Sequence, residues 1–223
     1  MDILDQIPPD IDFGALLARV RLSPESEDAA ALRGLLDEVQ PLIRPKAIYD
    51  LCPIGARGED SIEIGGVTFS SRVLAVNLRQ VHRAFPYICT CGAELDQVEA
   101  SDDSLREYWL DAIRLAALGL ARSYLPAHLE RKYAPGHLSN MAPGSLQDWP
   151  ISQQAPLFSL FGDAESKIGV SLTDSFLMRP LKSVSGIYFS DETDFESCQL
   201  CPREDCPGRA APYDPELWKT RYA

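Results

Sequence analysis

One long helical segment followed by short, closely spaced strand-like segments constrains the fold of this chain more than any other feature. Ser101 or Asp102 can cap a helix whose apolar residues recur at helical spacing and which ends near Tyr133. A loop-like stretch rich in Pro and Gly covers residues 134–150. Three strand-like runs then follow, at residues 168–172, 176–178 and 184–189. Strands that cluster after helices, without regular alternation, are typical of an α+β fold.

The remaining segments fit the same fold class. Ser23 and Pro24 predict the start of an amphipathic helix that runs to about Gln40. Apolar residues alternate on either side of Gly65-Gly66, which predicts a β-hairpin. We expect Pro126 to kink or restart the long helix, because proline lacks the amide hydrogen that a helix interior needs. Further elements are expected at residues 47–49 (strand), 71–83 (helix), 87–90 (strand) and 152–160 (helix).

Composition and charge exclude several function classes. The 223 residues include 21 Lys and Arg against 33 Asp and Glu, a net charge of −12. Such a charge argues against binding to nucleic acid or to an anionic membrane, because phosphate contacts need cationic side chains. No run reaches the ~20 apolar residues that span a bilayer. The amino terminus is acidic and lacks the basic start of a signal peptide, so we expect a cytoplasmic protein.

The most specific motif lies over residues 172–190, which read L-T-D-S-F-L-M-R-P-L-K-S-V-S-G-I-Y-F-S. This segment resembles the activation domain of cobalamin-dependent methionine synthase, where the pattern is approximately L-T-E-S-F-x-M-x-P-x-x-S-V-S-G-x-Y-F-S. Upstream, Ala142-Pro143-Gly144 resembles the A-P-G of the R-P-A-P-G-Y motif of that family. The resemblance is specific over about residues 102–190 and weaker over 45–100.

The resemblance implies a fold and a function. It implies a twisted antiparallel sheet with flanking helices, which binds S-adenosylmethionine and lies over a corrinoid. In that family the domain supports the reductive remethylation of cobalamin that has been oxidised to cobalt(II), with an electron donor such as flavodoxin or ferredoxin. We therefore expect an accessory protein, free-standing in this case, whose partner is a cobalamin-binding methyltransferase module.

The resemblance also implies a ligand site, at Asn140, Ala142, Pro143, Gly144 and Ser145. The chain departs from the family motif at two of these positions, since Asn140 replaces the Arg and Ser145 replaces the Tyr. An Arg pairs with a carboxylate through two hydrogen bonds, which an Asn does not reproduce. A substitute charge would have to come from elsewhere, and the candidates are Arg131, Lys132 and Arg179.

Three of the six cysteines form a second candidate site. Cys198, Cys201 and Cys206 make a C-x2-C-x4-C run, and thiolates at this spacing suit zinc or an iron–sulfur cluster. Candidates for a fourth ligand are Cys52, Cys89, Cys91 and His137. Free thiols in a solvent-exposed tail are the competing interpretation.

The chain divides by pattern into a helical segment over residues 1–44, an activation-domain-like part over 45–190 and a cysteine-containing tail over 191–223. No Ser-His-Asp arrangement, phosphate-binding loop or dinucleotide fingerprint is apparent, so we expect an accessory role. The alternative is a metal- or cluster-binding interaction module, or small electron carrier, that has lost the adenosylmethionine site. A third possibility is a detached subunit that completes a split enzyme.

Overall fold

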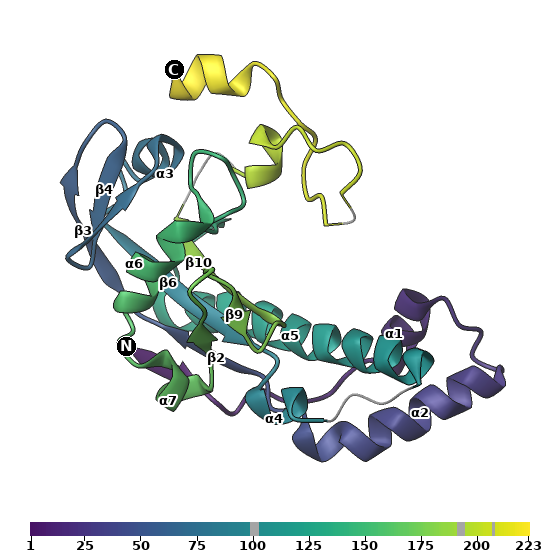
Figure 1. The fold of residues 1–223 in the computed structure, drawn as a ribbon. Coiled ribbons are helices and arrows are strands. Elements are labelled where there is room, and N and C mark those ends of the chain that lie inside the picture. The colour runs from purple at the N-terminus through teal and green to yellow at the C-terminus, as the bar shows by residue number, and fades with distance from the viewer. Residues whose placement is uncertain (99–102, 191–194, 207) are drawn as a thin grey trace.

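The structure is a computed structural model, and it describes residues 1–98, 103–190, 195–206 and 208–223. Helices cover both faces of a twisted antiparallel sheet (Figure 1), which confirms the predicted α+β class. The helices are α1 (Phe13–Val20), α2 (Glu27–Val39), α3 (Arg72–Asn77), α4 (Ala93–Asp96), α5 (Ser104–Tyr133), α6 (Gln154–Ser159) and α7 (Ala164–Ile168). The strands are β1 (Asp2–Leu4), β2 (Lys46–Tyr49), β3 (Cys52–Arg57), β4 (Ser61–Ile64), β5 (Val67–Ser70), β6 (Arg83–Thr90), β7 (Leu138–Met141), β8 (Ser171–Leu172), β9 (Met178–Arg179) and β10 (Ser183–Ser190).

Strand β6 is the centre of the sheet. One edge of β6 pairs with β10, in a register that places Gly186 opposite Tyr87. Its other edge pairs with β2 and then with β3, which continues into the hairpin of β4 and β5. Strand β1 adds to β2, and β7 adds to the free edge of β10. The two segments that carry the motif residues, 138–141 and 183–190, therefore lie side by side in the sheet.

Local sequence explains several elements directly. Gly65 and Gly66 have φ of +58° and +83°, the left-handed conformations that a two-residue hairpin turn requires, so the predicted hairpin is confirmed. Asp103 caps α5, since its Oδ1 accepts from the amides of Leu105 and Arg106 at 2.9 and 3.2 Å. The predicted caps Ser101 and Asp102 lie outside the described residues.

The long helix does not restart at Pro126. Helix α5 is continuous over 30 residues with Pro126 inside it. The flanking Leu125 and Leu129 are fully buried, and their packing offsets the ~3 kcal/mol that an internal proline typically costs.

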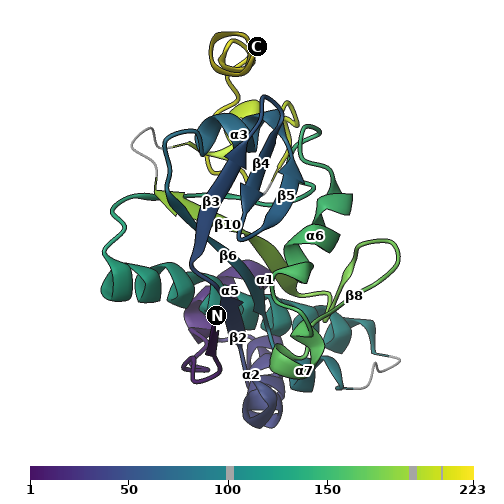
Figure 2. The ribbon, with the colours of Figure 1, turned by 90° about the vertical axis from the view of Figure 1, so that its left-hand side faces the viewer.

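Two apolar cores lie on opposite faces of the sheet. Helices α1, α2 and α5 pack against one face, where Phe85, Tyr87 and Cys89 point. The other face, where Ala84 and Ile88 point, is covered by α3, α6, α7 and the carboxyl-terminal tail (Figure 2). This alternation along β6 is the period of two that places successive side chains on opposite faces.

Several predicted boundaries are wrong: the strand expected over 176–178 is β9, Met178–Arg179, and the one expected over 87–90 begins at Arg83. Helix α2 begins at Glu27 with Ser26 as its cap, because the carbonyl of Ser23 accepts the Ser26 amide in a turn. Helix α3 ends at Asn77, and Arg83 already belongs to β6. The strand expected over 168–172 is reduced to Ser171–Leu172, since α7 continues to Ile168 and ends at Gly169 (φ +74°).

Strand β7 was not predicted, because residues 134–150 look like a loop in sequence. Leu138–Met141 is extended because its backbone pairs with β10, with Tyr188 opposite Asn140. A segment this short has no periodic signal of its own, so only the neighbouring strand determines its conformation.

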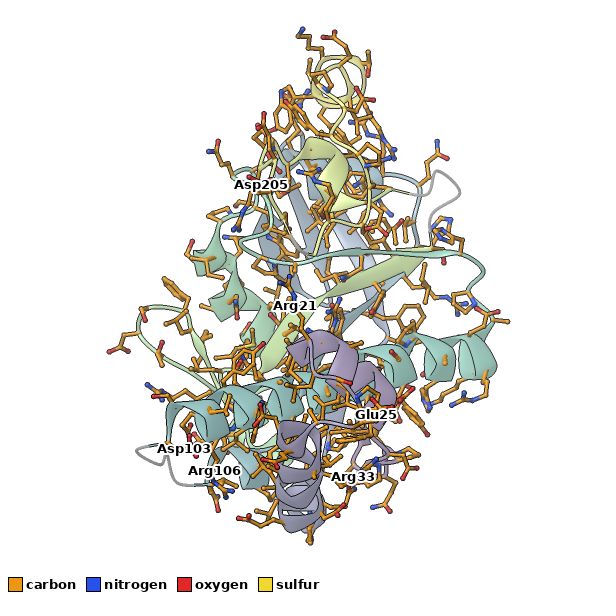
Figure 3. The ribbon with its side chains drawn as sticks, turned by 90° about the vertical axis from the view of Figure 1, so that its right-hand side faces the viewer. Arg21, Glu25, Arg33, Asp103, Arg106 and Asp205 are labelled. Atoms are coloured by element: carbon orange, nitrogen blue, oxygen red, sulfur yellow. The ribbon has the colours of Figure 1, made fainter. Side chains whose placement is uncertain are left out.

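The two terminal parts pack against the rest of the molecule. Strand β1 joins the sheet, and α1 and α2 share a core with α5. In the tail, Phe195 and Tyr222 are buried, and the Tyr222 hydroxyl donates to Oδ1 of Asn77 at 2.8 Å. The tail lies at the opposite end of the molecule from α2, as the labels of Asp205 and Arg33 show in Figure 3. In the ranges that the structure describes, no helix is long and apolar enough to cross a membrane.

Candidate functional site

A cavity of about 1080 Å³ opens between the loop after β7 and the carboxyl-terminal tail. Its size suits a ligand of nucleoside dimensions or larger. The loop contributes Gly144, Ser145, Leu146, Gln147, Asp148, Pro150 and Ile151. The tail contributes Leu200, Cys201, Pro202, Arg203, Tyr213, Asp214, Pro215 and Trp218.

Hydrogen bonds within the loop fix its backbone. The carbonyl of Ala142 accepts from the Ser145 amide at 3.1 Å and from the Ser145 hydroxyl at 2.6 Å. The Gly144 amide donates to the carbonyl of Trp149 at 2.7 Å, which closes the loop. Gly144 has φ of +84°, and a Cβ there would lie 2.8 Å from Cδ1 of Ile151. A glycine is therefore needed at this position for both the conformation and the space.

Asp148 anchors the loop to α3. Its carboxylate accepts from the Ser71 hydroxyl and from the amides of Arg72 and Val73, the latter two at 3.2 and 3.0 Å. Next to it, Trp149 is fully buried and packs edge-on against Phe69 with 6.2 Å between ring centroids. One wall of the cavity thus rests on the sheet and on the start of α3.

Arg209 organises the opposite wall. Its guanidinium donates to the carbonyls of Cys198, Cys201 and Ala211, each at 3.2 Å, and to that of Arg203. The Asp214 amide donates to the carbonyl of Gln199 at 2.8 Å. One half-buried cation and its carbonyl partners thereby hold this part of the tail in place.

The cavity combines apolar and charged groups. Ile151, Tyr213 and Trp218 remain 41%, 47% and 41% exposed, so three large apolar side chains gather at this cavity. Among the described residues that line the cavity, Arg203 carries the one cationic side chain, whereas Asp148 and Asp214 are acidic. The set offers ring surfaces, one guanidinium and carboxylates to a ligand.

The structure separates the five predicted ligand residues. Gly144 and Ser145 line the cavity, and Ala142 forms the turn that holds them. Pro143 is buried beside them. Asn140 lies in β7, away from the cavity, and its Oδ1 accepts from the Tyr87 hydroxyl at 3.1 Å. The ligand role of these residues stays a prediction.

The surroundings of Asn140 are tightly filled. Tyr87 stacks on Tyr188 with ring centroids 4.6 Å apart. Burial is the main cause that raises the pKa of Tyr87 well above its ordinary value, and the neighbouring Tyr188 is the second cause. Burial also raises the pKa of Tyr188, to about 12. A Cβ on Gly186 would lie 2.6 Å from the Met141 carbonyl and 2.9 Å from Asn140 Oδ1. The glycine of the S-V-S-G motif therefore permits close approach of a neighbouring strand.

None of the three substitute cations expected from sequence lines the cavity. Arg131 lies over the Tyr124 ring, 5.5 Å from its centroid. Lys132 donates to Asp2 and to the Tyr49 hydroxyl at 2.9 and 3.2 Å. Arg179 is in β9. The cationic side chain that does line the cavity, Arg203, was missed because nothing in sequence links the tail to the loop.

The cysteine run does not form a metal site among the described residues, where no three His, Cys, Asp or Glu side chains come together to hold an ion. Cys201 lines the cavity, and Cys198 Sγ accepts from the Ala210 amide at 3.4 Å. The proposed fourth ligands Cys52, Cys89 and Cys91 are buried in the two cores. The arrangement therefore gives no support to zinc or an iron–sulfur cluster.

Comparison with known proteins agrees with this architecture. Residues 140–199 match the family model of the vitamin B12 dependent methionine synthase activation domain. The fold is similar to the crystal structure of the MetH reactivation domain bound to AdoHcy, with a TM-score of 0.65 and 20% sequence identity over 87% of this chain and 79% of that chain. No curated protein matches the sequence. The predicted resemblance of this chain to the activation domain of cobalamin-dependent methionine synthase is therefore confirmed, by sequence over residues 140–199 and by fold over most of its length.

Proposed function

We propose that this protein supports the reductive reactivation of a cobalamin-dependent methyltransferase such as methionine synthase, and that it acts as an accessory protein to a separate corrinoid module. The family-model match and the fold both support a role in reactivation. We also propose that the protein acts as a free-standing protein in the cytoplasm.

The ligand that we assign to the cavity is S-adenosylmethionine. One observation carries this assignment: the matched segment 140–199 includes the whole loop wall of the cavity, from Gly144 to Ile151. The similar reactivation domain was crystallised with AdoHcy, which differs from adenosylmethionine by one methyl group. The ring surfaces and charged groups of this cavity suit a nucleoside joined to an amino acid.

The role of the chain is to hold and orient this ligand. Adenosylmethionine, when bound, would supply a sulfonium-linked methyl group. The partner's corrinoid would accept it once a flavodoxin- or ferredoxin-type donor had reduced its cobalt from cobalt(II) to cobalt(I), and S-adenosylhomocysteine would be left in the cavity. Because the cavity wall is pinned by Asp148 and Arg209, the ligand would be presented from a rigid surface. The chain itself then needs no catalytic acid or base.

The test is an anaerobic reactivation assay. A cobalamin-loaded methyltransferase module is prepared in the cobalt(II) state and mixed with adenosylmethionine and a flavodoxin donor, with and without this protein. Visible absorbance then follows the formation of methylcobalamin. We expect the protein to accelerate it at least several-fold. The proposal fails if the rate is unchanged and the two proteins do not associate in gel filtration.

The alternative is the metal-binding electron carrier suggested by Cys198, Cys201 and Cys206. Iron, zinc and acid-labile sulfide measured in anaerobically purified protein distinguish the two functions. Stoichiometric iron and sulfide would favour the electron carrier. If the protein binds no metal and still accelerates remethylation, the electron carrier is ruled out and the adenosylmethionine function is retained.

A further inference from the structure

The loop after β7 provides little of what an adenosyl amino acid needs for recognition. The Ser145 hydroxyl is satisfied internally by the Ala142 carbonyl, and the Gly144 amide by that of Trp149. Asn140 does not line the cavity, and its side chain accepts a hydrogen bond from the Tyr87 hydroxyl of β6. The loop residues that line the cavity include Gln147 and Ile151, but none of those described carries an aromatic ring or a cationic side chain. The groups that could discriminate a ligand have to come from the other wall.

The tail wall carries the aromatic surface. Trp218 is 41% exposed, whereas Trp109 and Trp149 are 6% and 0% exposed. The Trp218 ring packs against the buried Tyr222, with ring centroids 6.0 Å apart, and this contact supports the Trp218 ring. Tyr213 is 47% exposed on the same cavity. Exposed rings on a rigid support are the usual platform for a nucleobase, which stacks on them.

The same wall carries the charge. Arg203 lies at the cavity, and the Arg209 guanidinium holds its main chain through the Arg203 carbonyl. A guanidinium binds a carboxylate through two parallel hydrogen bonds. The Asp214 amide donates to the Gln199 carbonyl, and Asp214 Oδ1 accepts from the amides of Glu216 and Leu217 at 2.9 and 3.2 Å. The carboxylate is thereby held in place, and its Oδ2 can face a cationic group, either an ammonium or a sulfonium.

We infer that the carboxyl-terminal tail is the specificity wall of the cavity: Tyr213 and Trp218 bind the adenine, and Arg203 binds the carboxylate of an adenosyl amino acid. This rests on the proposed ligand. It also gives the tail a function that does not involve a metal. Arg209 is a positioning residue, since its contacts are with carbonyls that carry the wall.

The experiment is calorimetric titration of the full-length protein with S-adenosylhomocysteine and with 5′-methylthioadenosine, which lacks the amino acid part. We expect Trp218→Ala and Tyr213→Ala each to weaken binding of both ligands about tenfold or more. Arg203→Gln is expected to weaken adenosylhomocysteine by about tenfold and to leave methylthioadenosine unchanged. Matched controls are Lys219→Gln in the same tail and the exposed Tyr108→Ala on α5, neither of which lines the cavity.

Fluorescence gives an independent readout. Because Trp218 is the most exposed of the three tryptophans, acrylamide quenches mainly this residue, and bound ligand should protect it. Wild-type protein should lose most of its quenching on saturation, and Trp218→Phe should show neither effect. Circular dichroism of each variant confirms that it is folded.

The outcomes separate the two proposals. Wild-type binding that the Tyr213, Trp218 and Arg203 variants leave unchanged would overturn the specificity wall and retain the proposed ligand. No binding by the wild type at millimolar ligand would overturn the ligand assignment and this inference with it. Equal weakening of both ligands by Arg203→Gln would overturn the assigned role of the guanidinium.

Discussion

The hydroxyl of Tyr87 donates a hydrogen bond to Oδ1 of Asn140, although 53 residues separate the two in sequence. Tyr87 is buried, and its ring stacks on Tyr188. The position at which the related family carries an Arg is therefore part of the sheet's packing in this chain. Asn140 is expected to matter for stability more than for ligand binding.

Asn140→Ala should lower the free energy of unfolding by about 1–3 kcal/mol, because it leaves the buried Tyr87 hydroxyl without its acceptor. Urea unfolding measures the change. Adding Tyr87→Phe removes the orphaned hydroxyl, so the double variant should lose less than the sum of the single variants. Strict additivity, or a large loss of ligand affinity in Asn140→Ala, would contradict this role.

Gly186→Ala should destabilise the protein by about 1–3 kcal/mol, because overpacking beside a fixed backbone forces the strands apart. The added Cβ would lie 2.6 Å from the Met141 carbonyl, which belongs to β7 and cannot rotate away. Gly119→Ala in α5 is the matched control, since nothing lies within 4 Å of the place where its new methyl group would sit. It should stabilise the helix by up to about 1 kcal/mol. Thermal unfolding of both variants tests the contrast.

The six cysteines should divide into two reactivity classes. Cys52, Cys89 and Cys91 are buried, and burial raises the pKa of their thiols to about 11, 12 and 12. Thiolates are the reactive form, so these three should not react in the native state. Cys198, Cys201 and Cys206 are partly exposed and should react with a chromogenic disulfide.

Titration of the thiols with a chromogenic disulfide, first in native and then in denatured protein, counts the reactive and the unreactive cysteines. Three thiols are expected before denaturation and six after it, in line with the three half-exposed and three buried cysteines. Protection of the tail thiols together with co-purifying metal would contradict the free-thiol arrangement.

The His128 imidazole should make stability depend on pH. Burial, with the nearby charges of Lys132 and Arg131, lowers the pKa of His128 below its ordinary 6.5. The geometry agrees, because Lys132 donates to the Tyr49 oxygen and leaves the Tyr49 hydroxyl hydrogen for His128 Nε2, 2.9 Å away. The unfolded chain then binds a proton more readily than the folded one, so stability falls as the pH drops below 6.5.

Melting temperatures across this range, for wild type and for His128→Gln, measure the effect. The variant should show a flatter pH dependence, because glutamine accepts the Tyr49 hydrogen bond without titrating. The exposed His82→Gln serves as the control and should retain the wild-type slope. An unchanged slope in His128→Gln would show that another group is responsible.

The parts of the fold that sequence predicted are those that neighbouring residues determine. The hairpin at Gly65-Gly66 depends on two consecutive left-handed residues, and the extent of α5 depends on a cap and a helical apolar period. The resemblance over residues 172–190 likewise rests on one contiguous segment. Its implied fold, a twisted antiparallel sheet with flanking helices, is confirmed.

The rest was decided by contacts between distant segments. Strand β7 is extended because its backbone pairs with the edge of β10. Helix α5 continues through Pro126 because Leu125 and Leu129 are buried on either side of it. The wall at Tyr213, Trp218 and Arg203 meets the loop at Gly144 only after the tail has folded back over α3. Sequence by itself determined the hairpin, the long helix and the family resemblance, because these are encoded locally. Tertiary structure decided which side chains share the cavity, because burial and charge pairing act between residues that the chain places far apart.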